Sequence, residues 1–161
     1  MNSQQRTFLD LATAAAAKAN HPFPQMAACE AALESTWGHS QLAREDNNLF
    51  GMKQHAHPVF GTMTLPTEEC LDGKWVACSA NWVKYPDWRA CFADRLATLE
   101  RLSNAYPHYA AALRATDARS FVEEVSKSWA TDPNRALKVL GVYEEYVAAP
   151  PAAAPPSVPQ S

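Results

Sequence analysis

The chain has 161 residues, an apolar fraction of 47% and a formal net charge of −3. This length and composition favour one globular domain, and the slightly acidic balance argues against a nucleic-acid-binding surface, which needs clustered basic residues. No apolar run approaches the roughly 20 residues that a membrane helix requires.

The first twenty residues predict an amphipathic helix. Phe8, Leu11, Ala12 and Ala15 recur at the i, i+3, i+4 and i+7 positions of one apolar stripe, which predicts a helix over residues 3–18. The segment lacks the basic start and continuous apolar core of a conventional signal peptide.

A second helix is predicted to begin near Pro24, because proline is favoured in a first turn, and to end at Gly38. Its predicted inner face consists of Met26, Cys29, Ala32 and Leu33. Residues 43–59 are predicted to be irregular, since they combine Asn47-Asn48 with Gly51 and Pro58, which favour turns.

Residues 63–85 have the composition of strands. They are rich in β-branched and aromatic residues, and Asp72-Gly73 between the two runs predicts a hairpin turn. Two of the four cysteines, Cys70 and Cys78, flank this turn. Either these two form a local disulfide, or all four, with Cys29 and Cys91, are free thiols.

Helical patterning returns in the C-terminal half. Asp87 is a predicted N-cap for a helix through residue 102, shorter helices follow over 108–114 and 118–129, and Asp132-Pro133 predicts the start of a last helix reaching residue 147. Residues 149–161 are uncharged and proline-rich, which predicts a flexible tail after a domain spanning residues 1–148. The predicted fold class is α+β, mostly helical, with one inserted β-hairpin.

Glu34 is the titratable residue with the most informative surroundings. It lies near the end of the second predicted helix, between Leu33 and Trp37. An apolar setting would remove hydration and favour the protonated carboxyl, the form that a general acid needs. Cleavage of a glycosidic bond depends on such an acid, because the leaving oxygen must be protonated. An isolated glutamate would more simply be a solvent-facing residue at a helix end.

The sequence around Glu34 resembles the glucosaminidase domain of glycoside hydrolase family 73. It reads E-S-T-W-G and then N-N-L-F-G-M-K, and segments 67–73, 83–88 and 130–133 match further motifs in the order of the family. The resemblance covers roughly residues 5–147. It implies a lysozyme-like, two-lobed fold with a groove between a helical lobe and a small hairpin lobe. It also implies hydrolysis of peptidoglycan glycan strands without a metal or organic cofactor.

The resemblance assigns two catalytic carboxylates. Glu34 matches the catalytic acid, and Glu69 matches a second, hairpin carboxylate by its spacing to Gly73, with Glu68 as the alternate. Successive strand residues point to opposite faces, so only one of these two can face the groove. The second carboxylate either activates water or leaves that role to the N-acetyl group of the substrate.

Five residues are assigned to substrate binding: Asn48, Phe50, Tyr85, Trp129 and Asp132. The amide of Asn48 suits sugar hydroxyl or N-acetyl groups, and Tyr85 and Trp129 offer stacking surfaces, whereas core packing is the favoured interpretation for Phe50. Trp129 and Arg135 stand where the family usually has tyrosines. Arg135 is therefore expected either to pair with an anionic wall component or to lie exposed.

Several alternatives stay open. A lytic transglycosylase or an N-acetylmuramidase would use the same scaffold, although the former usually continues with G-L-M-Q where this chain has N-L-F-G-M-K-Q. A non-catalytic wall-binding module is the alternative of another class. His55 and His57 lack a third ligand at suitable spacing, which favours a loop over a metal site.

The expected setting follows from the resemblance. We expect a monomer that contacts peptidoglycan strands at the cell wall, without nucleic acid and without membrane insertion. Since no conventional signal peptide is recognised, release as for phage lysins or through a specialised secretion machine is expected.

Overall fold

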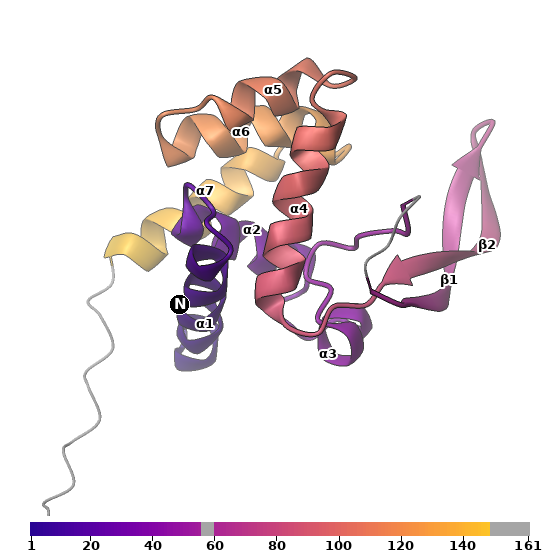
Figure 1. Cartoon of the computed structure of the whole chain (residues 1–161), viewed down its shortest axis with the longest axis horizontal. Coiled ribbons are helices and arrows are strands. Elements are labelled where there is room, and N and C mark those ends of the chain that lie inside the picture. The colour runs from indigo at the N-terminus through magenta and orange to yellow at the C-terminus, as the bar shows by residue number, and fades with distance from the viewer. Residues whose placement is uncertain (56–59, 149–161) are drawn as a thin grey trace, which may run out of the picture.

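The computed structural model describes residues 1–55 and 60–148, without the side chains of residues 69–71. Within these ranges the elements are α1 (Ser3–Lys18), α2 (Pro24–Glu34), α3 (Gln41–Asp46), β1 (Thr62–Leu71), β2 (Lys74–Val83), α4 (Trp88–Leu102), α5 (Pro107–Leu113), α6 (Ala118–Trp129) and α7 (Arg135–Ala148). The helices gather into one lobe and the hairpin extends from its side (Figure 1). The predicted α+β class is confirmed, whereas the tail at 149–161, His57 and Pro58 lie outside the described residues.

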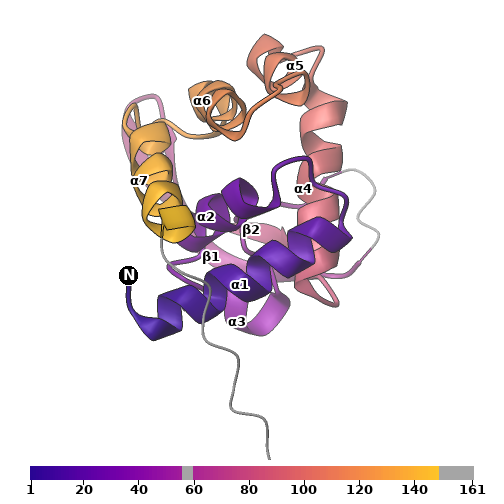
Figure 2. The ribbon, with the colours of Figure 1, turned by 90° about the vertical axis from the view of Figure 1, so that its left-hand side faces the viewer.

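Helix α2 forms the centre of the helical lobe. It packs against α1, α6 and α7, and Figure 2 shows it surrounded by its neighbours. Every residue from Met26 to Ala32 is buried, and most are small, which lets the surrounding helices approach closely. A helix that is buried all round has no free face. Its two ends reach the surface, and the C-terminal end carries Glu34.

The end of α2 differs from the prediction. The helix stops at Glu34, because Thr36, Trp37 and Gly38 adopt left-handed φ angles of 53°, 57° and 79°. Ser35 stabilises this turn, since its Oγ donates to the carbonyl of Ala31 at 2.6 Å and accepts from the Gly38 N–H at 2.9 Å. Positive φ is uncommon for residues other than glycine, so a structured turn fixes the position of Glu34.

The prediction is wrong for one residue of the inner face of α2. Leu33 is 37% exposed, because the helix ends one residue later and no neighbouring helix covers that side. The short helix α3 was also missed within a segment predicted to be irregular. Its signal was Ser40, whose side chain accepts from the Ala43 N–H as an N-cap.

The hairpin forms as predicted. Strands β1 and β2 pair antiparallel, and the turn residues Asp72 and Gly73 both have positive φ, as a tight two-residue turn requires. Cys78 pairs with Thr67 in the register and is a free thiol, so the local disulfide with Cys70 is wrong.

Two C-terminal helices begin at aspartate N-caps. Asp87, the predicted cap, accepts a backbone N–H at the start of α4, and Asp117 does the same at the start of α6. Helix α7 starts at Arg135, slightly later than predicted, because Asp132 accepts the N–H of Asn134 in the turn before it. No helix within the described ranges is long and apolar enough to span a membrane.

Candidate active site

Glu34 and Arg135 meet where two helix ends come together. Glu34 is the last residue of α2 and Arg135 is the first residue of α7. Arg135 Nε donates to Glu34 Oε1 at 2.9 Å, and the glutamate side chain is 27% exposed. Among the described residues, none forms a hydrogen bond with Oε2. One carboxyl oxygen of Glu34 is therefore held by the protein, and the other is available to a ligand.

Arg135 belongs to an ion cluster of four residues, Arg95, Glu30, Arg135 and Glu34. Glu30 Oε1 accepts from Arg95 Nη2 and from Arg135 Nη2, both at 2.9 Å. Glu30 is 0% exposed and Arg95 is 2% exposed. Two guanidinium groups alternate with two carboxyl groups along the cluster, so the buried charges of Arg95, Arg135 and Glu30 have partners, which makes their burial tolerable.

The pKa of Glu30 reflects this arrangement. Burial alone would raise it, but the guanidinium groups of Arg95 and Arg135 outweigh burial and hold the pKa below its ordinary value. Glu30 therefore remains a carboxylate in the folded protein and provides a fixed negative charge one helical turn before Glu34.

Two expectations about this region are wrong. Arg135 is neither exposed nor available to an anionic wall component, because it is 5% exposed and its guanidinium contacts two carboxylates of α2. The setting of Glu34 is not simply apolar, since a positive charge contacts it. The physical reason is helical spacing: residues four apart lie on the same face, so one guanidinium reaches both Glu30 and Glu34.

Trp129 borders the ion cluster at the end of α6. Its ring lies 4.2 Å from the guanidinium carbon of Arg95, which is cation–π contact, and 6.5 Å from the ring of Phe50. Trp129 is partly exposed, whereas Phe50 is 4% exposed and also packs on Phe92. The favoured core interpretation of Phe50 agrees with these contacts, and Trp129 keeps accessible ring surface.

Tyr85 and Asn48 lie at the base of the hairpin and are buried. The Tyr85 hydroxyl donates to Asp94, and the Asn48 amide donates to the carbonyls of Met52 and Val83. These polar groups are buried and form hydrogen bonds within the protein. Their described contacts connect the hairpin to the helical lobe.

Glu68 and Glu69 occupy adjacent positions of β1, opposite Ala77 and Val76. Alternate residues of this strand differ in solvent exposure. Met63, Leu65 and Thr67 are partly covered, whereas Thr64, Pro66 and Glu68 are exposed. Glu69 falls by position in the same alternating set as Thr67.

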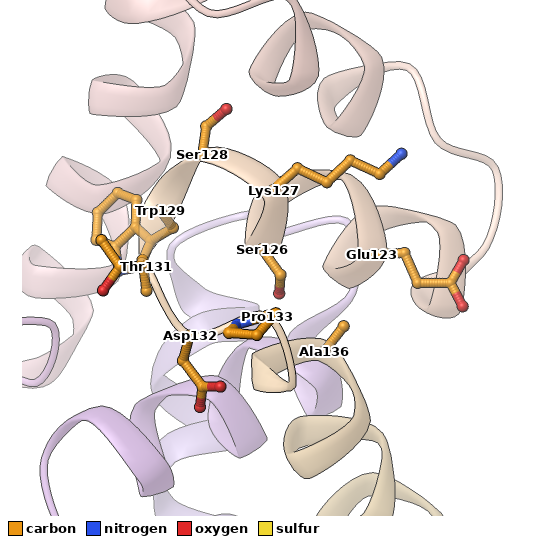
Figure 3. Close-up of a pocket in the computed structure, with 10 residues that line it drawn as sticks. Glu123, Ser126, Lys127, Ser128, Trp129, Thr131, Asp132, Pro133 and Ala136 are labelled. Carbon is orange, nitrogen blue, oxygen red and sulfur yellow. The ribbon is translucent and has the colours of Figure 1, made fainter.

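Asp132 lies on the loop between α6 and α7. Its carboxylate accepts from Lys138 Nζ at 2.6 Å and from the Asn134 N–H. The loop borders a pocket of about 850 Å³ whose lining includes Trp129, Asp132 and Ser126 (Figure 3). Glu34 does not line this pocket, but Ser126 connects the two, because Ser126 Oγ accepts from Arg135 Nη1 at 2.8 Å.

No group of three or more potential metal ligands occurs among the residues that the structure describes. His55, the described member of the histidine pair, instead lies 3.4 Å from a carboxylate oxygen of Asp94.

The comparisons with known proteins give one consistent family. Residues 10–148 match the family model Glucosaminidase, described as mannosyl-glycoprotein endo-beta-N-acetylglucosaminidase. A probable N-acetylmuramidase of Lactococcus lactis is 33% identical over 137 residues, which are 81% of this chain and 30% of that protein. The exo-glucosaminidase LytG of Bacillus subtilis is 32% identical over 130 residues, 78% of this chain and 45% of that protein. This chain thus spans less than half the length of these curated relatives.

A solved structure extends the similarity to the fold. The catalytic domain of the autolysin Auto from Listeria monocytogenes superposes with a TM-score of 0.76 at 26% identity, covering 91% of this chain and 86% of that one.

Proposed function

Because this chain belongs to the glucosaminidase family of glycoside hydrolases, we propose that it hydrolyses the glycan strand of peptidoglycan as an endo-β-N-acetylglucosaminidase. The bond is assigned from the family description, since the relatives named above are called a muramidase in one case and a glucosaminidase in another. The substrate is the peptidoglycan of the cell wall, where the protein acts as a monomer.

The observation that carries this proposal is the carboxyl group of Glu34, of which only one oxygen is hydrogen-bonded to the protein. It stands at the C-terminal end of a helix whose middle is buried, with Oε1 fixed by Arg135 and Oε2 free of protein partners among the described residues. A general acid needs this combination of fixed position and accessible oxygen. In the proposed step, the proton on Oε2 moves to the glycosidic oxygen. The bond from that oxygen to the anomeric carbon breaks, and its electron pair stays on the oxygen.

Glu69 is the proposed second carboxylate. Its spacing to Gly73 supports it over Glu68, whose side chain is exposed. A carboxylate on the hairpin lobe can activate the water that attacks the anomeric carbon. Separations of about 6.5–9.5 Å between the two carboxyl groups suit that role, and about 5 Å suits a nucleophile.

The proposed binding surface lies around the loop between α6 and α7. Trp129 offers a partly exposed ring on which a sugar can stack, and Asp132 lies three residues further along beside the pocket. Phe50 supports this surface through its ring contact with Trp129, whereas Tyr85 and Asn48 are buried at the base of the hairpin and act on the site only through the fold.

Mass spectrometry of digested, purified peptidoglycan tests the proposed function. New reducing N-acetylglucosamine ends are expected. Reducing N-acetylmuramic ends would instead indicate a muramidase, and anhydro-muramic ends would indicate a lytic transglycosylase. Binding to the wall without any new ends would indicate a non-catalytic module and contradict the proposal.

A further inference from the structure

We propose that Arg135 is a positioning residue that makes Oε2 of Glu34 the oxygen carrying the transferred proton. This inference rests on the proposed role of Glu34 as the general acid. It explains why a buried arginine occupies a position where tyrosine is usual in the glucosaminidase family.

The guanidinium of Arg135 is fixed by three contacts. Nε donates to Glu34, Nη1 donates to Ser126 of α6, and Nη2 donates to Glu30, all within 2.9 Å. A guanidinium is planar, so three partners in different directions determine both its position and its orientation. The Nε–H direction therefore determines where Oε1 of Glu34 lies, and Oε2 is turned away from the cluster.

Electrostatics favour the same role. When Oε2 gives up its proton, Glu34 becomes a carboxylate, and the guanidinium contacting Oε1 stabilises the new negative charge without moving. The positive charge of Arg135 is itself held in place by Glu30, which is fully buried and ionised. Glu30 thus acts through Arg135, and Arg135 acts through Glu34.

Two variants of Arg135 separate positioning from structural support. In Arg135→Met no donor remains, whereas in Arg135→Gln the amide nitrogen stands at the place of Nε and can still donate to Glu34. Both variants lose the bonds to Glu30 and Ser126. We expect kcat on soluble, uncrosslinked glycan strands to fall about 100-fold for Met and about 10-fold for Gln, with KM changed less than about 3-fold. Equal losses in the two variants would overturn the proposal.

The fold should survive these changes, because Glu30 keeps its other partner, Arg95, which lies 2.9 Å away in the native protein. Ser126→Ala provides a second test that removes only one contact of the guanidinium, and it should lower kcat several-fold. An unchanged kcat in Ser126→Ala would also count against a guanidinium held by three contacts. Arg119→Gln, which breaks exposed pairs with Glu123 and Glu144, is the matched control and should leave kcat unchanged.

A double variant distinguishes failure of this inference from failure of the proposed function. If Arg135 acts through Glu34, adding Arg135→Met to Glu34→Gln should cause no further loss. A Glu34→Gln variant with native activity would overturn the proposed acid. An inactive Glu34→Gln together with a fully active Arg135→Met would overturn the positioning role alone.

Discussion

Replacement of Glu30 by glutamine tests whether the ion cluster holds the fold together. Glu30 is 0% exposed, and its Oε1 accepts from two guanidinium groups at 2.9 Å. Glutamine keeps the shape and one oxygen acceptor but removes the charge, which leaves Arg95 and Arg135 as like charges in the interior. Breaking a buried ion cluster in this way typically lowers the free energy of unfolding by about 3–5 kcal/mol.

Urea unfolding at neutral pH measures this loss. With a slope of about 2 kcal/mol per molar urea, the expected loss moves the midpoint down by about 1.5–2.5 M. The matched control is Glu144→Gln, which breaks a pair between side chains that are 55% and 63% exposed. That pair contributes at most about 1 kcal/mol. Equal midpoint shifts in the two variants would refute the argument that the cluster stabilises the core.

The pH dependence provides a second check on Glu30. Its pKa in the folded protein is below the ordinary value of 4.5, so its contribution is present above that value and is lost as the pH falls below it. The stability difference between the native protein and Glu30→Gln should therefore be constant near neutral pH and shrink below about pH 4.5. A difference that instead shrinks on raising the pH would contradict this sign.

Three further predictions concern other parts of the fold and the site. Burial lowers the pKa of His21 from 6.5 to about 4. As the pH falls, the unfolded chain therefore binds a proton at His21 before the folded protein does, and roughly 3 kcal/mol of stability should be lost between pH 6.5 and 4. His21→Gln should flatten the stability curve between pH 6.5 and 4 in urea titrations, and an unchanged slope would contradict the assignment. Gly38→Ala should cost about 1–3 kcal/mol, because φ is +79° and the new Cβ would lie 3.0 Å from the Phe8 ring; an unchanged melting temperature would count against this strain. Glu69→Gln should reduce wall-clearing activity more than Glu68→Gln, and the reverse order would put Glu68 in the groove.

Local signals predicted most of the fold. The cap Asp87, the proline at position 24 and the Asp72-Gly73 turn each act through neighbouring backbone groups, so their effects can be predicted from short segments. The end of α2 could not be predicted in this way. It depends on left-handed residues that Ser35 stabilises and on the distant Phe8 ring, which packs edge-on against Trp37.

The ion cluster is the part of the site that could not be predicted from the sequence. Arg135 was recognised as unusual, but its partners lie 101 and 105 residues away in the sequence. A signal for the other members was present. Glu30 lies four residues after Met26 on the predicted inner face of α2, and Arg95 lies three residues after Phe92 and four before Leu99, on the buried face of α4. Charged residues on apolar helix faces require partners of opposite sign, which identifies a buried ion pair although not its link to Glu34.

The buried binding residues have a similar explanation. Asn48 and Tyr85 are polar and aromatic residues beside the catalytic motif, a composition that suits both a sugar site and a structural joint. The structure gives them intramolecular partners: Met52 in the same segment, Val83 at the end of β2 and Asp94 on α4, and the last two are brought within reach only by tertiary packing.

The rate of glycan cleavage by Glu34→Gln is the most direct measurement of the central claim. Glutamine keeps the length of the side chain and an acceptor for Arg135 but cannot give up a proton as a carboxylic acid does. Glu45→Gln on α3 is the control, because that glutamate is exposed and its described hydrogen bond is only to Gln41. On soluble glycan strands we expect Glu34→Gln to fold normally and to lose at least about 100-fold in kcat, while the control keeps its full rate. Cleavage by Glu34→Gln at the native rate would contradict the account.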